Sequence, residues 1–350
     1  MAGLDQWHPI YPSRALGRKP IALKRMGREL VLFRTAANGI GAFLDSCPHR
    51  GMRLSLGRVE RDKLVCPYHG WCFDSCGNGQ SPGSPRLHVT ASHFNVAEHE
   101  GLIWIKDPGS TATLPTLRYA GYHLLYLAHV PMMAPVESLM ENFTEIEHTG
   151  IAHWQFGYDV NRMDEVSVDV ESDADTVRVR TAGPQKRLWL PTRWAMGVRP
   201  GDLLKFDWTT RFAPLHSTAD FWWEDPHTGQ VRPCRFKEVA YFIPVGPRES
   251  LSVAYYFWSF AGARRWVRPL LKPFVALGTR YEIGRDKWLI ENVVPQTLFA
   301  AGRRLGRFDK GLFELRKRWQ TWRQTYSIPE YGQVEETTST QLDRPPEESP

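Results

Sequence analysis

Two short segments of the chain combine a cysteine and a histidine in nearly the same way, and they constrain the fold more than any other feature of the sequence. The first is CPHRG at residues 47–51 and the second is CPYHGW at residues 66–71, with sixteen residues between His49 and Cys66. Thiolates and imidazoles spaced this closely are typical metal ligands. Three interpretations are open at this point: a structural zinc site, an iron–sulfur cluster, or coincidence.

The way in which the donors are shared between the segments favours the cluster. Common structural zinc sites take two cysteines from one knuckle and a histidine pair from elsewhere. Here each segment supplies one cysteine and one histidine. This suits a two-iron cluster in which one iron takes both cysteines and the other iron takes both histidines. Gly51 and Gly70 allow tight turns that bring backbone amides toward the sulfurs.

The two segments resemble the Rieske [2Fe–2S] motif. The resemblance implies a cluster held by Cys47, His49, Cys66 and His69. Rieske proteins of membrane complexes carry an additional disulfide-forming cysteine in each cluster loop. This chain has Met52 and Tyr68 at those positions, so it resembles the oxygenase and ferredoxin branch.

Apolar periodicity predicts two domains and a tail. Residues 20–108 form short alternating runs joined by turn residues, which predicts an all-β module. Alternation returns at residues 163–260, and helical spacing is found around it. The polar, proline-bearing C-terminal segment is expected to be disordered. We therefore expect a Rieske domain at residues 1–110, a linker, a catalytic domain at residues 119–328 and a disordered tail at residues 329–350.

A second group of metal-binding side chains lies in ENFTEIEHTGIAHW, residues 141–154. Asn142, Glu145 and His148 recur every three residues, which predicts one helical face. His153 would lie about 140° further round a continuous helix, so we expect a break at Thr149-Gly150 to re-aim it. Two histidines and one carboxylate form a non-heme Fe(II) site that leaves coordination positions open for O₂.

This stretch resembles the mononuclear-iron motif of Rieske oxygenases, which implies His148 and His153 as ligands. In that family the third ligand is an aspartate on a C-terminal helix. The segment GRDKWLIENV at residues 284–293 resembles that helix and puts Asp286 in the ligand position. Glu282 and Glu291 remain competing carboxylates.

One position departs from the family pattern. In the family, an aspartate three residues before the first iron-binding histidine links the Rieske histidine to the mononuclear site, usually across a subunit boundary. Here that position is Glu145, which is one methylene longer. The resemblance implies that Glu145 connects His69 with His148. The alternative is a glutamate on a helix surface without such a role.

The resemblance also implies an overall fold and an activity. The fold is α+β: an all-β Rieske domain followed by a helix-grip-like catalytic domain with an antiparallel sheet flanked by helices. The activity is oxidation of an apolar, aromatic or polycyclic small molecule with O₂ at a mononuclear Fe(II), by hydroxylation, demethylation or a related reaction. The assembly implied is a homotrimer. A different reading is a Rieske electron-transfer protein without oxygen chemistry of its own, and a structural zinc protein is a third.

Electrons must come from outside this chain under the oxygenase reading. No G-x-G-x-x-G dinucleotide fingerprint is visible in the sequence. We therefore expect NAD(P)H to act through a separate reductase, with or without a ferredoxin between them.

Composition limits the remaining partners. No run of 18 apolar residues is found, so no membrane span is expected. The N-terminal residues lack the layout of a secretion signal, and five cysteines are too few for a disulfide scaffold, so we expect a cytoplasmic protein. The net charge of +6 is mild for 350 residues and no nucleic-acid-binding module accompanies it, so no nucleic-acid partner is expected.

Overall fold

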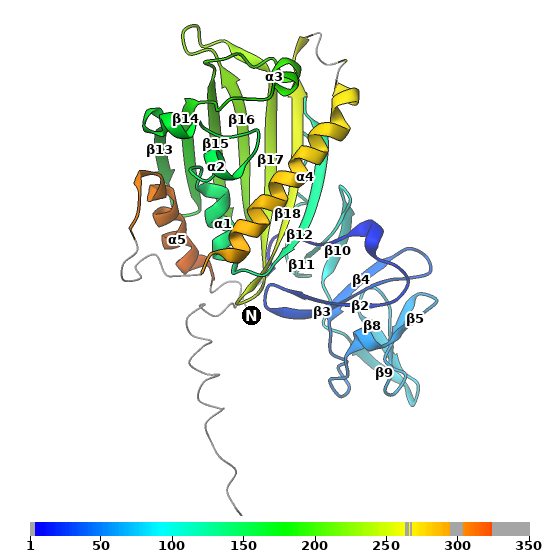
Figure 1. Cartoon of the computed structure of the whole chain (residues 1–350). Helices are drawn as coiled ribbons and strands as arrows, with labels where there is room; N and C mark the ends of the chain where they lie inside the picture. The colour runs from blue at the N-terminus through cyan, green and yellow to red at the C-terminus, as the bar shows by residue number, and fades with distance from the viewer. Residues whose placement is uncertain (1–3, 263–265, 267, 295–303, 324–350) are drawn as a thin grey trace, which may run out of the picture. The chain divides into compact units, whose positions relative to one another are not determined.

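The computed structural model describes residues 4–262, 266, 268–294 and 304–323 (Figure 1). The chain divides into two compact units, residues 1–119 and residues 120–350, and each unit is described by itself. The tail expected to be disordered, residues 329–350, lies outside the described residues.

The first unit is built from three antiparallel sheets (Figure 1). Asn38 lies in the turn between the strands that end at Arg34 and begin at Ile40. Its φ of 65° is a left-handed conformation that asparagine tolerates better than most residues. The order of the first sheet is β1 (His8–Pro12), β11 (Leu102–Lys106) and β10 (Asn95–His99). The second contains β2 (Ile21–Arg25), β3 (Arg28–Arg34) and β4 (Ile40–Leu44). The third contains β5 (Arg58–Glu60), β6 (Lys63–Val65), β7 (Cys72–Phe73), β8 (Asn78–Ser81) and β9 (Ser84–Thr90).

The hydrophobic core of this unit includes two of the predicted cluster ligands. Cys47 and Cys66 are buried in one cluster with Phe33, Phe43 and Phe73. The remaining short elements of the unit are the 3₁₀ helices η1 (Ser13–Ala15) and η2 (Leu54–Leu56). The packing of aromatic side chains against the thiols anchors the base of both Cys-His segments.

The second unit is organised on a seven-stranded, fully antiparallel sheet (Figure 1). Six strands follow one another as a meander, and the earliest strand, β12, pairs with the last, β18. Residues 123–132, which form β12, were not among the predicted strands. The order across the sheet is β12 (His123–Met132), β18 (Glu249–Phe260), β17 (Val231–Gly246), β16 (Leu215–Glu224), β15 (Leu203–Phe212), β14 (Thr176–Pro184) and β13 (Ser167–Ser172).

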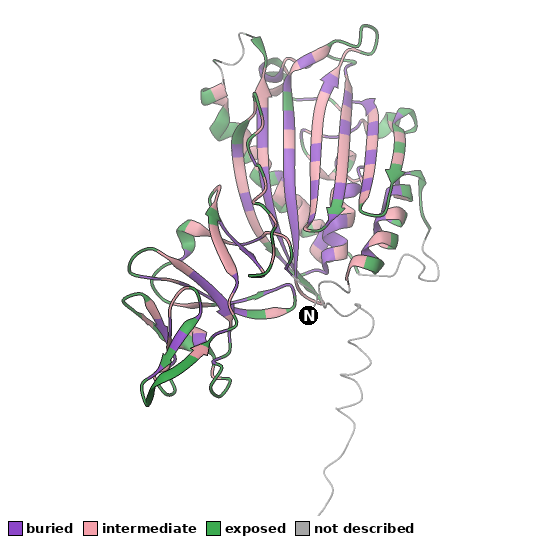
Figure 2. Cartoon of the chain, turned by 180° about the vertical axis from the view of Figure 1, so that it is seen from behind, coloured by how far each residue is buried: buried purple, intermediate pink, exposed green. Residues whose placement is uncertain are grey.

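The longer helices of this unit cover one face of the sheet (Figure 1), and the view from behind shows the strands of the opposite face (Figure 2). Buried and less buried residues alternate along several strands in that view, as expected for a sheet with one covered face. The helices are α1 (Val136–Thr144), α2 (Thr149–Ala152), α3 (Leu190–Met196), α4 (Arg268–Asn292) and α5 (Lys310–Trp322), with 3₁₀ turns η3 (Val160–Glu165) and η5 (Arg307–Asp309).

The predicted α+β fold is confirmed by this architecture. In the C-terminal described segment, Phe308 of η5 and Leu312, Leu315 and Trp319 of α5 are buried. None of the helices in the described part of the chain is long and apolar enough to cross a membrane.

Candidate functional site

The two Cys-His segments form loops with the same backbone geometry. In the first, the amide of Cys47 donates to the carbonyl of Met52, and the amide of Gly51 donates back to the carbonyl of Cys47. In the second, Cys66 donates to Trp71, and Gly70 donates back to Cys66. The two glycines have φ angles of +68° and +70°, which favour glycine on steric grounds.

The two loops differ in what they connect. The second loop joins β6 to β7, which pair with each other, so it does cap a hairpin. The first loop leaves β4, which pairs with β3, and leads to β5, which pairs with β6. It therefore connects two sheets, because the chain after β4 continues into a separate sheet and does not fold back on β4.

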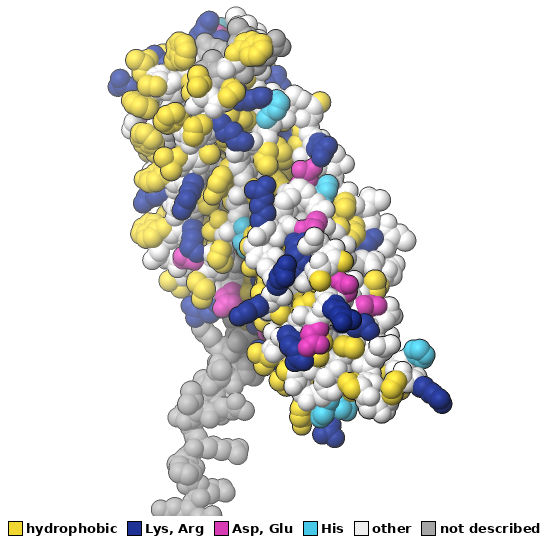
Figure 3. Space-filling view, turned by 90° about the vertical axis from the view of Figure 1, so that its right-hand side faces the viewer, with side chains coloured by type: hydrophobic (Ala, Val, Ile, Leu, Met, Phe, Trp, Pro, Cys, Tyr) yellow, Lys and Arg dark blue, Asp and Glu magenta, His cyan; other side chains and the backbone are white. Residues whose placement is uncertain are grey.

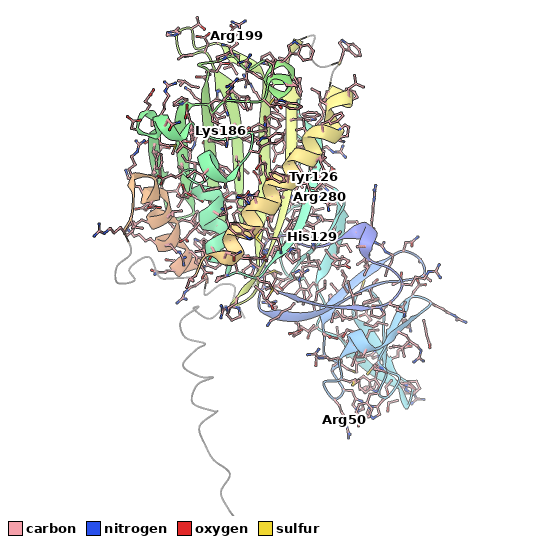
Figure 4. The ribbon with its side chains drawn as sticks, in the orientation of Figure 1. Arg50, Tyr126, His129, Lys186, Arg199 and Arg280 are labelled. Carbon is pink, nitrogen blue, oxygen red and sulfur yellow. The ribbon has the colours of Figure 1, made fainter. Side chains whose placement is uncertain are left out.

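All four predicted cluster ligands come together at these loops. The thiols of Cys47 and Cys66 are each in residues that are only 2% exposed, and they lie within hydrogen-bond reach of each other. The rings of His49 and His69 are exposed, with centroids 4.6 Å apart. Trp71 stacks on His49 with centroids 4.5 Å apart and an angle of 3° between the planes. Arg50, labelled in Figure 4, marks the tip of the first loop.

The chemistry of this donor set fits a two-iron cluster. Burial, together with the neighbouring Cys66 thiol, raises the pKa of Cys47 to about 11, while hydrogen bonds from the backbone of His49 and Arg50 act in the opposite direction. Those amides would stabilise a thiolate bound to iron, because hydrogen bonds to sulfur favour the charged form. Each loop supplies one buried sulfur and one exposed imidazole. This arrangement matches a cluster in which one iron is bound by the two sulfurs and the other iron by the two imidazoles.

The second predicted site is built where the helix α1 ends. The expected continuous helix through His148 is wrong: α1 stops at Thr144, and Glu145 has an extended backbone with φ −87° and ψ 127°. The expected break at Thr149-Gly150 is also wrong, since these residues begin the short helix α2. The Thr144 hydroxyl donates to the carbonyl of Met140, a bond of the kind that slightly destabilises and bends helices.

His148 and His153 flank α2, and this explains how two histidines five residues apart face the same point. His148 precedes the helix with helical angles, whereas His153 follows it with φ −86° and ψ 144°. The Nζ of Lys186 donates to the carbonyls of Thr149 (3.0 Å) and of His153, and so satisfies the end of this single turn. Figure 4 labels Lys186 in this part of the unit.

The structure brings the two histidines next to Asp286 of α4. The Nε2 atom of His153 lies 2.8 Å from the Asp286 carboxylate, and the Nε2 atom of His148 lies 3.5 Å from it. One potential ligand atom from each of the three residues lies within 4.8 Å of the others. Two imidazoles and one carboxylate at this spacing fit a single Fe(II) ion and leave its remaining positions open.

The charges at this group are strongly coupled. Burial alone would lower the pKa of His148, but hydrogen bonds with Asp286 and Glu145 outweigh it and raise that pKa to about 9. Burial alone would raise the pKa of Asp286, and hydrogen bonds with His148 and His153 lower it to about 2. A divalent cation would replace these protons, because it needs a neutral imidazole and an ionised carboxylate.

Glu145 lies on the other side of the His148 ring. Its Oε2 atom is 3.1 Å from the Nδ1 atom of His148, and its second oxygen accepts from the backbone of Glu147. A proton held at Nδ1 leaves the lone pair of Nε2 directed at Asp286 and His153. This is the way in which carboxylates commonly orient metal-binding histidines.

The two competing carboxylates are engaged elsewhere. Glu282 accepts from the backbone amides of Trp154 and Gln155 at 2.9 and 3.2 Å. Glu291 accepts from the amide of Met133 and pairs with Lys287. Of the three acidic residues considered, Asp286 is the one found among the group of potential ligands.

A cavity of about 110 Å³ opens beside the three side chains. This is several times the roughly 10–15 Å³ that one water needs. Most of its lining is apolar and comes from the sheet, α1 and α4. The lining residues that matter here are Leu125, Phe143, Phe156, Phe206, Trp208, Phe221, Phe236, Glu238 and Tyr256.

Glu238 lines this cavity, and the motifs of the sequence did not point to it. The signal that could have identified Glu238 is its place in the apolar run of β17, where the neighbouring residues 239–243 are all buried. A charged residue type at such a position is uncommon without a partner or a role.

Comparison with known proteins directly supports a Rieske domain in the first unit. Residues 6–93 match the family model of the Rieske [2Fe–2S] domain. The chain is 32% identical over 179 residues to the 4beta-methylsterol monooxygenase of Methylococcus capsulatus, covering 46% of this chain and 47% of that protein. It is 33% identical over 166 residues to the methylxanthine N1-demethylase of Pseudomonas putida, covering 42% of this chain and 46% of that protein. The matched part thus spans less than half the length of these curated relatives.

Similarity in structure extends over both units. The crystal structure of dicamba monooxygenase bound to 3,6-dichlorosalicylic acid matches with a TM-score of 0.72 at 18% identity, covering 92% of this chain and 98% of that one. At this identity the match shows the fold. The chain therefore carries a Rieske [2Fe–2S] domain, and it is similar to the alpha subunits of Rieske oxygenases.

Proposed function

We propose that this chain is the oxygenase component of a Rieske-type system. It uses O₂ and electrons from a separate NAD(P)H-dependent reductase to hydroxylate, demethylate or otherwise oxidise an apolar small molecule. The observation that carries the proposal is the convergence of His148, His153 and Asp286 at the edge of an apolar cavity. A chain that only transferred electrons would need the first unit alone.

The four donors of the first unit are proposed to hold the [2Fe–2S] cluster, and the three donors of the second are proposed to hold iron. When bound, the cluster supplies one-electron transfer and the mononuclear iron supplies O₂ activation. The exposure of His49 and His69 supports the first assignment, because a redox partner has to approach that end of the cluster closely. The position of Asp286 between two imidazoles, with its side chain only 17% exposed, supports the second.

The residues around the second site have separate tasks under this proposal. Glu145 holds the Nδ1 proton of His148 and so keeps Nε2 directed at the ion. In an assembled trimer, Glu145 would also accept from His69 of a neighbouring copy. The phenylalanines of the sheet exclude water from the reacting end of the substrate, which limits side reactions.

The relatives support the substrate class in a general way. Their names refer to a methylsterol, a methylxanthine and dicamba, all small molecules with ring systems. The cavity beside the histidines is lined mainly by aromatic side chains, which suit flat apolar compounds. We therefore propose an aromatic or polycyclic substrate.

The surface of α4 supports the proposed assembly with other protein molecules. Five large side chains of this helix are 55–73% exposed on its outer side: Leu270, Phe274, Leu277, Tyr281 and Trp288. Figure 3 shows hydrophobic side chains with Lys and Arg among them on the face to which α4 contributes. Apolar surface of this extent is uncommon on a monomer, and a second copy of the chain, as in a homotrimer, is the proposed occupant.

The test is the metal content of anaerobically purified protein. Iron, zinc and acid-labile sulfide are measured per chain, and an EPR spectrum is recorded after reduction. The proposal expects about three irons, two sulfides and a Rieske-type signal. Two irons and two sulfides that do not change on addition of Fe(II) would indicate an electron carrier. Zinc without sulfide would contradict both assignments.

A further inference from the structure

One row of side chains crosses the sheet beneath the cavity. Trp208 on β15 is opposite Ala219 on β16, Ala219 is opposite Glu238 on β17, and Glu238 is opposite Tyr256 on β18. Strands are about 4.8 Å apart, so the backbones of Trp208 and Glu238 are about 10 Å apart. The small Ala219 between them is fully buried. Trp208, Glu238 and Tyr256 all line the cavity.

Two polar atoms of this row lack partners. Glu238 is 6% exposed, and its carboxyl is hydrogen-bonded to the hydroxyl of Tyr256. Its Oε1 atom, however, has no hydrogen-bond partner among the described residues, and the same holds for the Nε1 atom of Trp208. Burying a polar group without a partner costs free energy. A ligand that supplied both partners would recover this cost, whereas a purely apolar ligand would not.

The next row of the sheet supplies a flat apolar wall. Phe206, Phe221 and Phe236 are consecutive cross-strand partners, two residues along each strand from the polar row. The rings of Phe221 and Phe236 are stacked, with centroids 4.9 Å apart and planes 4° from parallel. A planar ring system lying on this wall would present one edge to the polar row.

The charge of the cavity argues against an anionic ligand. The described residues that line it include four acidic side chains, Glu145, Glu238, Glu282 and Asp286, but no lysine or arginine. Burial raises the pKa of Glu238 to about 8, and the nearby Asp286 carboxylate acts in the same direction. A carboxylate bound at the Trp208 and Glu238 end of this cavity would lie near acidic side chains, and the described lining offers it no lysine or arginine.

Building on the oxygenase function proposed above, we infer that the substrate is an uncharged molecule with a planar apolar body and one polar edge. This edge carries an acceptor for the indole N–H of Trp208 and a second hydrogen-bonding group for Glu238, as in a lactam. Trp208 and Glu238 thus determine specificity and orient the substrate relative to His148, His153 and Asp286. Carboxylates are excluded.

The test compares three ligands with the same fused two-ring skeleton by equilibrium dialysis under anaerobic conditions, with the metal-containing protein. They are 2-quinolinone, a neutral lactam; naphthalene, its apolar counterpart; and 2-naphthoate, a carboxylate. We expect 2-quinolinone to bind at least about tenfold more tightly than naphthalene, the size of effect that one or two buried hydrogen bonds produce. The 2-naphthoate anion should bind most weakly.

Variants assign the preference to the two residues. Trp208→Phe removes the N–H and keeps an aromatic ring, and Glu238→Leu removes the carboxyl. Each should reduce the preference for 2-quinolinone over naphthalene, and the double variant should abolish it. Trp222→Phe is the matched control, because the indole of Trp222 donates to Glu224 at 2.8 Å and does not line the cavity. It should retain the wild-type ranking.

Three results would overturn the inference. One is equal binding of naphthalene and 2-quinolinone by the wild-type protein, which would mean that water is the hydrogen-bond partner of Trp208 Nε1 and Glu238 Oε1. Another is tightest binding of 2-naphthoate. The third is a preference that survives in the double variant. If the variants do not fold, the wild-type ranking still decides. Because the ligand ranking is read from binding and not from turnover or metal analysis, its failure is distinguishable from failure of the proposed function.

Discussion

The two candidate metal sites differ in almost every physical respect. At the first, the four donors lie within residues 47–69, on two loops with the same hydrogen-bonding pattern. At the second, Asp286 is 133 residues from His153 and on a different element. The imidazoles of the first site are exposed, whereas His148 and His153 are only 17% and 15% exposed at their side chains.

The difference corresponds to two kinds of chemistry. A site that exchanges electrons with a partner protein benefits from ligands at the surface, and its potential depends on hydrogen bonds from nearby backbone. A site that activates O₂ benefits from exclusion of water and from a neighbouring cavity that positions the substrate. Loops with tight glycine turns build the first, and packing of a helix across a sheet builds the second.

The largest expected effect concerns the loops. Cys66→Ala removes a buried ligand, so acid-labile sulfide and the Rieske EPR signal should be lost completely. Metal binding contributes to folding at such sites, so the thermal stability of the first unit should fall as well. Differential scanning calorimetry with sulfide analysis measures both. The control is Cys76→Ser, since Cys76 is exposed. Loss of sulfide in that variant as well would contradict the assignment of ligands.

The mononuclear iron should be lost without loss of the Rieske cluster when a ligand of the second site is replaced. Asp286→Asn should remove about one iron per chain and reduce product formation by at least about 100-fold, because loss of a direct ligand exceeds the effect of losing a supporting residue. The Rieske spectrum should remain. Glu291→Gln is the control on the same helix, since glutamine can still accept from the amide of Met133. If Asp286→Asn abolished the cluster signal, the independence of the two sites would be refuted.

The contact between Glu145 and His148 should have a smaller effect. Glu145→Gln cannot hold the Nδ1 proton of His148 as strongly, so product formation should fall by about 10- to 100-fold. Iron content should change less than it does in Asp286→Asn. Glu145→Asp should retain most of the activity, because it keeps the carboxylate. Turnover in Glu145→Ala equal to that of the wild type would rule out any role for this side chain.

The smallest effect concerns the sheet that supports the second site. Burial lowers the pKa of His216 to about 4, and its Nδ1 atom lies 2.6 Å from the carbonyl of Pro214. The unfolded chain therefore binds a proton that the folded chain does not bind between about pH 6.5 and pH 4. Stability should decrease as the pH falls through this range, by on the order of 2 kcal/mol.

His216→Phe isolates that contribution. Phenylalanine keeps the stacking on Tyr241, whose ring centroid is 5.2 Å away, and does not titrate. Urea unfolding at several pH values should show a flatter pH dependence in this variant than in the wild type. An identical slope in both proteins would mean that His216 does not titrate with the low pKa.

Much of the fold could be read from the sequence, because its signals are local. Alternation of apolar and polar residues identified the β module and the second sheet, and helical spacing identified the segments that contain α4 and α5. The strand β12 was missed because it is a sheet edge whose pairing with β18 depends on residues more than a hundred positions away. The end of α1 at Thr144 was missed because the three-residue spacing of Asn142, Glu145 and His148 continues past it, although Glu145 has an extended backbone.

What the sequence by itself determined is the pair of cluster loops: their donors, their glycines and their spacing are encoded within 25 residues, so short-range geometry is sufficient. For the second site, the sequence offered His148, His153 and Asp286 only through a resemblance, and the tertiary structure decided how these side chains come together. Glu282 and Glu291 accept hydrogen bonds from backbone amides, whereas the Asp286 carboxylate lies beside the imidazoles of His148 and His153. The tertiary structure also aligned Trp208 with Glu238 across three strands, a relation that arises only from strand register.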